Sequence, residues 1–131
     1  MISADTSVVV RYLVGSPPDQ AERARLLMDG PEAIGLSLPV LVETAHVLRT
    51  QYGVPRADVV ATIIELLTRA NVEVLGLPTE RALQAMVSAR SLPGTPIPDA
   101  LIAAVARWAG ALPVYTFDVT FGRHGVPVAQ P

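Results

Sequence analysis

The feature that most constrains the fold of this chain is an alternation of short apolar runs with longer helical patterns. The apolar runs are bounded by Gly, Pro, Asp or Ser, as is typical of buried strands. Between them, apolar residues recur at the three- and four-residue spacing of amphipathic helices. Strands separated by helices predict right-handed crossovers and a mostly parallel sheet that is covered on both faces.

The expected elements can be placed along the chain. Strands are predicted over residues 1–4, 33–37, 72–77 and 112–117, with a short fifth strand in the V-P-V of the tail. Helices are predicted over residues 8–13, 20–28, 38–52, 56–70, 79–91 and 98–109. Asp5 and Thr79 have side chains of the kind that cap helices. We therefore expect an α/β fold with four to five strands, formed by residues 1–131 as a single domain.

Composition excludes several classes of protein. The chain has no cysteine, which rules out disulfides, zinc–thiolate sites and cysteine nucleophiles. Half of its residues are hydrophobic and 17% are charged, as in a globular protein. No apolar run approaches the roughly 20 residues that span a bilayer. The N-terminus has no basic region followed by a long apolar stretch, so we expect no signal peptide and a cytoplasmic location.

The charged residues bear on nucleic-acid binding. The net charge of −2 argues against bulk electrostatic capture of nucleic acid. All ten basic residues are arginine, which offers bidentate recognition of phosphate. The candidates that lie close in sequence to the acidic segments described next are Arg11, Arg49, Arg90, Arg107 and Arg123.

Four acidic residues lie within or beside apolar stretches. They are Asp5 in M-I-S-A-D, Glu43 in P-V-L-V-E-T-A-H, Asp99 in P-I-P-D-A-L-I-A-A and Asp118 in V-Y-T-F-D-V. A carboxylate drawn toward an apolar core costs several kcal/mol unless its charge is compensated. Four carboxylates are tolerated together if they converge on a divalent cation, and oxygen ligands suit Mg²⁺ or Mn²⁺. The pattern therefore indicates a metal-dependent hydrolase of phosphodiesters, and a ribonuclease in particular.

Each acid also has a purely structural interpretation. Asp5 is placed to cap the first helix, Asp99 lies in a first helical turn, and Asp118 follows a strand as turn residues do. Glu43 lies between Val40 and Val47 on one stripe of an apolar helix and is the hardest to explain structurally. Glu65 serves as a contrast, because it shares a polar helical face with Arg69 at the i,i+4 spacing and needs no function.

The histidines and two aromatic residues receive structural interpretations. We expect His46, one turn beyond Glu43, to be partly buried with a local partner. His124 in G-R-H-G is expected to be a loop residue. Trp108 and Tyr115 are expected in the core, because the chain has few aromatic residues.

The four acidic segments together resemble the motifs of PIN-domain nucleases. I-S-A-D-T-S-V-V-V-R-Y-L resembles the opening of that family, L-S-L-P-V-L-V-E-T-A-H-V-L-R its second motif, P-D-A-L-I-A-A-V-A its third and Y-T-F-D-V-T-F its fourth. The final G-V-P-V resembles the family's ending. Order, spacing and length are similar to VapC-type toxins of bacterial toxin–antitoxin pairs, over essentially the whole chain.

The resemblance implies a three-layer α/β/α sandwich, Mg²⁺ or Mn²⁺ at the acidic cluster, and cleavage of RNA. It also implies a cognate VapB-like antitoxin and a homodimer. Asp5, Glu43, Asp99 and Asp118 would hold the metal directly or through water. The hydroxyls that would orient these carboxylates are those of Thr6 or Ser7 and of Thr116. The chain departs from the family in its sparse basic residues near the site and in the proline-rich approach to Asp99.

Specific residues distinguish this chain from proteins with other functions. A phosphorelay receiver domain also binds Mg²⁺ at strand ends, but it needs a lysine near the phosphate and an acidic pair after its first strand. This chain has no lysine and one aspartate there. A P-loop is excluded because no G-K-[ST] is present. A catalytically degenerate PIN-like binding or scaffold protein is the remaining alternative, although a scaffold gains nothing from clustered acids.

Overall fold

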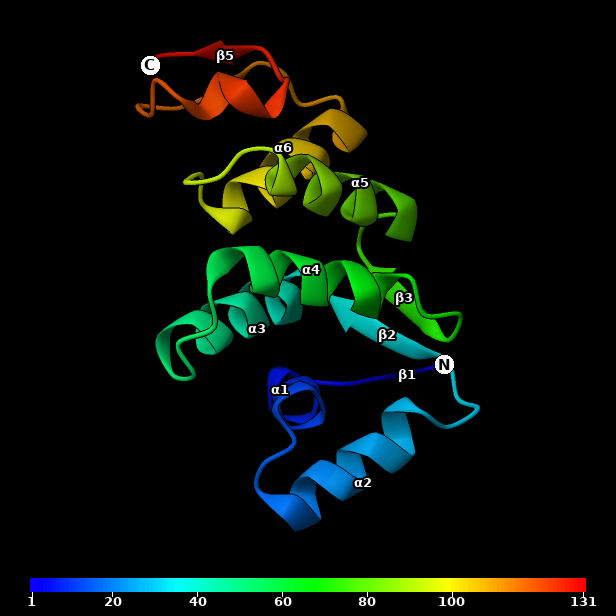
Figure 1. Ribbon diagram of the computed structural model, residues 1–131. Helices are drawn as coiled ribbons and strands as arrows, with labels where there is room; N and C mark the ends of the chain where they lie inside the picture. Colours follow the sequence, from blue (N-terminus) through cyan, green and yellow to red (C-terminus); the bar gives the residue numbers. More distant parts are fainter.

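A computed structural model describes residues 1–131 as six α-helices, five short strands and one 3₁₀ helix (Figure 1). The strands are β1 (Ile2–Ser3), β2 (Ile34–Ser37), β3 (Val72–Leu75), β4 (Val114–Tyr115) and β5 (Val128–Ala129). The helices are α1 (Thr6–Val14), α2 (Pro18–Met28), α3 (Leu38–Thr50), α4 (Arg56–Leu67), α5 (Thr79–Arg90), α6 (Ile97–Ala109) and the 3₁₀ helix η1 (Phe121–His124).

Local signals explain where most helices begin and end. Asp5 caps α1, which ends at Gly15 with a left-handed φ of 76°. Ser37 caps α3, with Pro39 in its first turn. The expectation that Thr79 caps α5 was wrong, because Pro78 occupies the cap position without a side-chain bond. The Thr79 hydroxyl instead accepts a hydrogen bond of 3.0 Å from the Val74 N–H in β3.

The fold class is confirmed as α/β with parallel strands. In the first sheet the order is β1-β2-β3, with Ile2 paired to Ile34 and Ile34 to Val72. The second sheet consists of β4 and β5, with Val114 paired to Val128. The five strands thus lie in two parallel sheets instead of one continuous sheet.

The two sheets are far apart in the molecule. Figure 1 places the β4–β5 pair at one end of the molecule and β1 well away from it, with helices α3–α6 between them. The C-terminal pair is attached to α6 by the Arg107 guanidinium, which donates to the carbonyl oxygens of His124 (3.2 Å) and Gly125 (3.1 Å). This attachment keeps β4 away from the free edge of β1.

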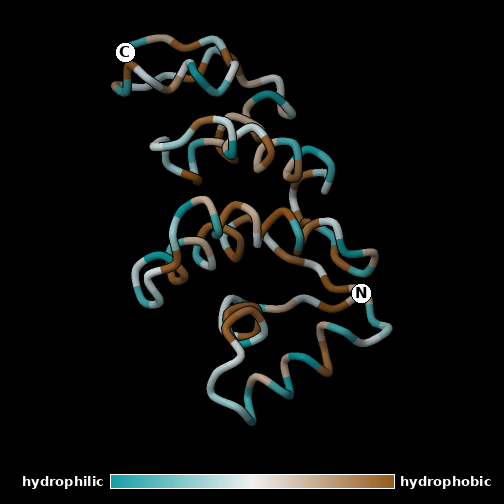
Figure 2. Tube along the Cα trace, in the orientation of Figure 1, coloured by the Kyte–Doolittle hydropathy of each residue, from teal (hydrophilic) through white to brown (hydrophobic).

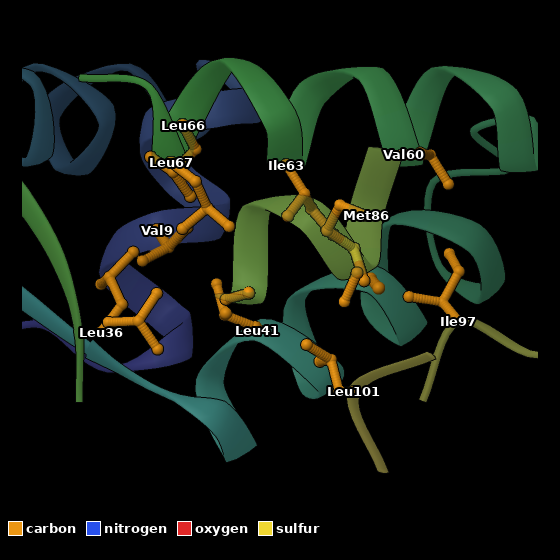
Figure 3. Close-up of a cluster of buried hydrophobic side chains, with 14 of the residues drawn as sticks. Val9, Leu36, Leu41, Val60, Ile63, Leu66, Leu67, Met86, Ile97 and Leu101 are labelled. Carbon is orange, nitrogen blue, oxygen red and sulfur yellow. The ribbon is translucent and has the colours of Figure 1, made fainter. Parts of the chain in front are cut away.

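The main core is built by helices α1 and α3–α6 around β2 and β3. Figure 3 shows Val9, Leu41, Ile63, Met86 and Ile97 from these five helices in one cluster, each at most 2% exposed. A second, small cluster joins Ala103 of α6 to Phe121 and Val126, with Val114 of β4 packed against it. The C-terminal sheet therefore has its own apolar anchor on α6.

Several large apolar side chains near the C-terminus are exposed. Trp108 is 54% exposed and Tyr115 is 65% exposed, so the expectation that both are core residues was wrong. Phe117 and Val119 are 83% and 84% exposed. Figure 2 shows hydrophobic stretches in this segment at the end of the molecule. None of the helices has the length and apolar character needed to cross a membrane.

A polar cluster joins α1, α2 and the residues after α4. The Tyr12 hydroxyl donates to Asp29 Oδ1 at 2.8 Å, and the Arg69 guanidinium donates to both Tyr12 and Asp29 at 2.8 Å. The expected pairing of Glu65 with Arg69 was therefore wrong. Asp29 takes the guanidinium because α2 packs beside α1, a contact that helical spacing within α4 does not reveal.

Candidate functional site

Asp5 lies at the carboxyl end of β1 and caps α1. Its Oδ1 accepts from the Ser7 N–H (3.0 Å), the Ser7 hydroxyl (2.6 Å) and the Val8 N–H (3.3 Å). The Ser7 hydroxyl and the helix N–H groups hold the pKa of this carboxyl below its ordinary value. All three bonds go to one oxygen, which leaves Oδ2 of an ionised, exposed carboxylate free for a ligand.

Glu43 lies in α3, the helix that follows β2, and it is exposed. The buried stripe of α3 consists of Leu41, Thr44, Ala45 and Leu48, and Glu43 lies outside it. Because β1 and β2 are parallel neighbours, Asp5 and Glu43 both follow strands at the same edge of one sheet. They are the first pair of the four acids.

Asp99 and Asp118 form a second pair, together with His124. Asp99 lies half-buried in the first turn of α6, and burial raises its pKa. His124 opposes this shift in the pKa and the charge of Asp118 adds to it. The three side chains are thus within electrostatic reach of one another, although they come from α6, the turn after β4, and η1.

Asp118 is held in a tight turn. Its Oδ1 accepts from the N–H and the hydroxyl of Thr120 at 2.8 and 2.7 Å, which lowers its pKa. Thr116 contacts Asp118 differently, since its hydroxyl accepts from the Asp118 N–H at 2.9 Å. Thr120 is therefore the hydroxyl that orients this carboxylate, as Ser7 does for Asp5. Asp118 Oδ2, like Asp5 Oδ2, is free of these bonds.

His124 is a residue that the sequence interpretation did not assign to the site. Its ring packs against Phe121 at 5.4 Å between centroids, and it lies at the end of η1. It also lines a hollow of about 460 Å³ with Arg81 and Arg107. The signal available in the sequence was the G-R-H-G turn shortly after Asp118. The short 3₁₀ helix η1 turns the chain back after Asp118, so that His124 lies near the acidic residues.

A second hollow lies at the start of α6. It measures about 530 Å³ and is lined by His46, Arg49 and Arg56, with Ile97 and Pro98 of α6. His46 is exposed there, so the expectation of partial burial was wrong. Both hollows carry arginine and histidine side chains and flank the helix that bears Asp99. This is suitable chemistry for contacts with phosphate groups.

The structure does not gather the four acids into one cluster. No group of three or more Asp, Glu or His side chains is close enough to hold a metal ion. Asp5 and Glu43 belong to the three-stranded sheet, and Asp99 and Asp118 belong to α6 and the β4–β5 segment. Their oxygens are the donors that Mg²⁺ prefers, but their placement within one chain does not fit a shared ion.

Comparison with known proteins gives one result. A family model described as the PIN domain matches residues 2–126, a range that contains all four acids and His124. No curated protein and no solved structure matches the chain.

Proposed function

The chain belongs to the PIN-domain family, and on that premise we propose that it is an Mg²⁺- or Mn²⁺-dependent endoribonuclease that acts as the toxin of a toxin–antitoxin pair. PIN domains are generally nucleases. The observation that carries the proposal is the family match over residues 2–126, which spans all four acids in order. Its partners would be the RNA substrate, a VapB-like antitoxin and a second copy of the chain.

The side chains around Asp99 support hydrolysis of a phosphodiester. Asp99 is half-buried with a raised pKa, which suits it to hold or release a proton nearer neutral pH than an exposed aspartate. His124 lies within electrostatic reach and offers a second site for that proton. With no cysteine in the chain, water is the expected nucleophile. When bound, the metal ion would supply charge neutralisation at the phosphate.

The arginines near α6 provide the groups that would bind the phosphates of RNA. Arg81 lines one hollow beside α6 and Arg49 lines the other, whereas Arg107 and Arg56 line the same hollows but already donate to main-chain carbonyls. Guanidinium groups form charge-assisted, bidentate hydrogen bonds with phosphate oxygens. An RNA strand laid over these hollows would therefore meet an arginine in each of them.

A cleavage assay tests the proposal. Purified protein is incubated with total RNA and Mg²⁺, and the wild type is compared with Asp99→Asn and with Asp58→Asn. Asp58 is an exposed acid in the first turn of α4 and serves as the matched control. We expect cleavage by the wild type and by Asp58→Asn, loss in Asp99→Asn, and loss with a chelator. Cleavage that survives Asp99→Asn would contradict the assignment.

Expression in a bacterium tests the toxin role. Growth arrest by the wild type, relieved by Asp99→Asn, is the expected result. One observation favours the alternative of a PIN-like binding or scaffold protein, namely that no three of the acids are close enough to hold a metal ion. That alternative predicts RNA binding without cleavage, at every protein concentration and with either metal ion.

A further inference from the structure

Strands β1 and β4 each have one edge without a strand partner. In β1, the Ile2 and Ala4 N–H groups donate to Ala33 and Gly35 at 2.9 and 3.3 Å, so Ser3 faces the opposite, open edge. In β4, Val114 and Thr116 donate to Pro127 and Ala129 at 2.9 and 3.0 Å. By the same alternation Tyr115 faces the open edge of β4. Both strands therefore offer unpaired main-chain groups to another strand.

Apolar side chains are exposed beside both open edges. Met1 and Ile2 are 67% and 38% exposed next to β1. Tyr115, Phe117 and Val119, in and after β4, are 65%, 83% and 84% exposed. Large apolar groups gathered at an unpaired edge are typical of a surface that another chain covers.

The two edges do not meet within one chain. The β4–β5 pair is fixed to α6 by Arg107 and by Phe121 and Val126, which pack on Ala103. Helix α6 is fixed in turn by Ile97, Ala100 and Leu101, which lie in the main core. Figure 1 shows β1 and the C-terminal pair separated by helices α3–α6. A second copy can reach β1 without breaking any of these contacts.

We propose that two copies of this chain pair reciprocally, with β4 of one copy added in parallel to the open edge of β1 of the other. Each pairing would extend the three-stranded sheet to five parallel strands. Because the carboxyl ends of parallel strands share one edge, Asp5 after β1 and Asp118 after β4 of the partner would be brought together. A two-fold arrangement closes the pair and forms two such sites.

This pairing rests on the proposed function. It assigns the acids of the active site to two copies of the chain instead of one. Each site combines Asp5 and Glu43 from one copy with Asp99, Asp118 and His124 from the other. This explains why no chain by itself gathers three acids that could hold a metal ion. The repulsion among the assembled carboxylates would be relieved by a divalent cation.

A disulfide test measures the pairing independently of any activity. The chain has no cysteine, so Ser3→Cys and Thr116→Cys can be made as separate single variants, mixed and oxidised. We expect a covalent dimer in the mixture, because Ser3 faces the shared edge and would lie opposite a β4 residue that faces β5, as Thr116 does, and opposite residues of paired strands lie within disulfide range. Ser91→Cys, exposed at the end of α5, replaces Thr116→Cys in the control mixture and should give none above background.

Two outcomes overturn the pairing. One is the absence of a covalent dimer in the mixture of Ser3→Cys with Thr116→Cys. The other is an internal disulfide in the double variant while the mixed single variants remain uncrosslinked, which would show that the strands close within one chain.

An activity test asks whether the site is shared. Asp5→Asn and Asp118→Asn are inactive alone if both carboxylates are needed. In a dimer of one Asp5→Asn chain and one Asp118→Asn chain, one site loses both carboxylates and the other keeps both. Random mixing makes about half of all dimers mixed, so about a quarter of wild-type cleavage should return. Glu43→Gln mixed with Asp5→Asn is the control and should restore none, because these two acids come from the same copy.

The two proposals fail in different ways. A wild-type protein that forms the disulfide pair but cuts no RNA contradicts the nuclease function alone. A wild type that cuts RNA, with no rescue in the mixture and no disulfide pair, contradicts the shared site alone.

Discussion

At the scale of single residues, a structural role and a functional role can be carried by the same carboxylate. Asp5 Oδ1 takes all three capping bonds, and Asp118 Oδ1 takes both bonds from Thr120. In each case Oδ2 is left for another partner. The structural interpretation of these acids is correct as far as the bonds go, and it leaves one oxygen of each carboxylate available for the proposed function.

The two roles of Asp5 can be separated by substitution. Asparagine caps helices about as well as aspartate, whereas alanine costs about 1 kcal/mol. We expect Asp5→Ala to lower the free energy of unfolding by about that amount and Asp5→Asn to change it little. Both should abolish RNA cleavage. Urea unfolding followed by circular dichroism measures the first effect, and cleavage retained in Asp5→Asn would show that only the cap matters.

The raised pKa of Asp99 predicts a pH-dependent stability. Between its ordinary pKa of 3.8 and the raised pKa, folded Asp99 holds a proton that the unfolded chain has lost. Stability contributed by this group therefore falls as pH rises through that window and stays lower above it. We expect Asp99→Asn to raise Tm at pH 7, with a difference that shrinks toward pH 3.8. Thermal unfolding at both pH values checks this, and a lower Tm for Asp99→Asn at pH 7 would contradict it.

At the scale of elements, most helices and strands begin and end close to the residues that the sequence predicts. Capping by Asp5 and Ser37 and termination at Gly15 and Gly110 are local, because each depends on a few neighbouring residues. Thr79 was misassigned because its hydroxyl is taken by a strand N–H. A local signal cannot report a competing partner that the tertiary fold supplies.

Arg56 holds the element that carries Asp99. Its guanidinium donates to the Thr95 carbonyl (3.0 Å), the Ala89 carbonyl (3.1 Å) and the Thr95 hydroxyl (3.3 Å). These bonds tie the start of α4 to the end of α5 and to the loop before α6. No pattern in the sequence predicts this contact, since Arg56 and Thr95 are distant along the chain.

We expect Arg56→Met to lower the free energy of unfolding by about 1.5–3 kcal/mol, the usual range for hydrogen bonds to a charged group. Arg56→Lys should lose most of this, because one ammonium group does not reproduce the planar fork of donors. Arg90→Met, at an exposed position in the last turn of α5, is the control. Equal stability of Arg56→Met and Arg90→Met in urea would contradict the role of these bonds.

At the scale of the whole molecule, the arrangement of the two sheets decides how many acids meet. In one chain the acids stand as two pairs, and in the proposed pair of chains they stand as two sets of four. Metal binding and association are then linked, because an ion that binds only the paired form stabilises that form by mass action.

The linkage predicts a concentration-dependent effect of Mg²⁺. Where chains are paired, saturating Mg²⁺ should raise Tm. At an Mg²⁺ concentration of a hundred times Kd, the free energy of unfolding should rise by about 2.7 kcal/mol. Where dilution separates the chains, the rise should be much smaller. Differential scanning fluorimetry across protein concentration, with Ca²⁺-free buffer and with the Asp99→Asn variant as control, measures it. The same Mg²⁺ shift at all concentrations would place the ion within a single chain.

What the sequence by itself determined is everything that depends on short range: the helices and strands, the parallel α/β class, and the family over residues 2–126. Only the tertiary structure decided which strand edges pair. That pairing in turn decides which carboxylates come together. Strand pairing joins segments distant in the chain, and its outcome depended here on the anchoring of β4 and β5 to α6. The exposure of Trp108 and Tyr115 follows from the same cause, because an aromatic residue is buried only where another surface arrives to cover it.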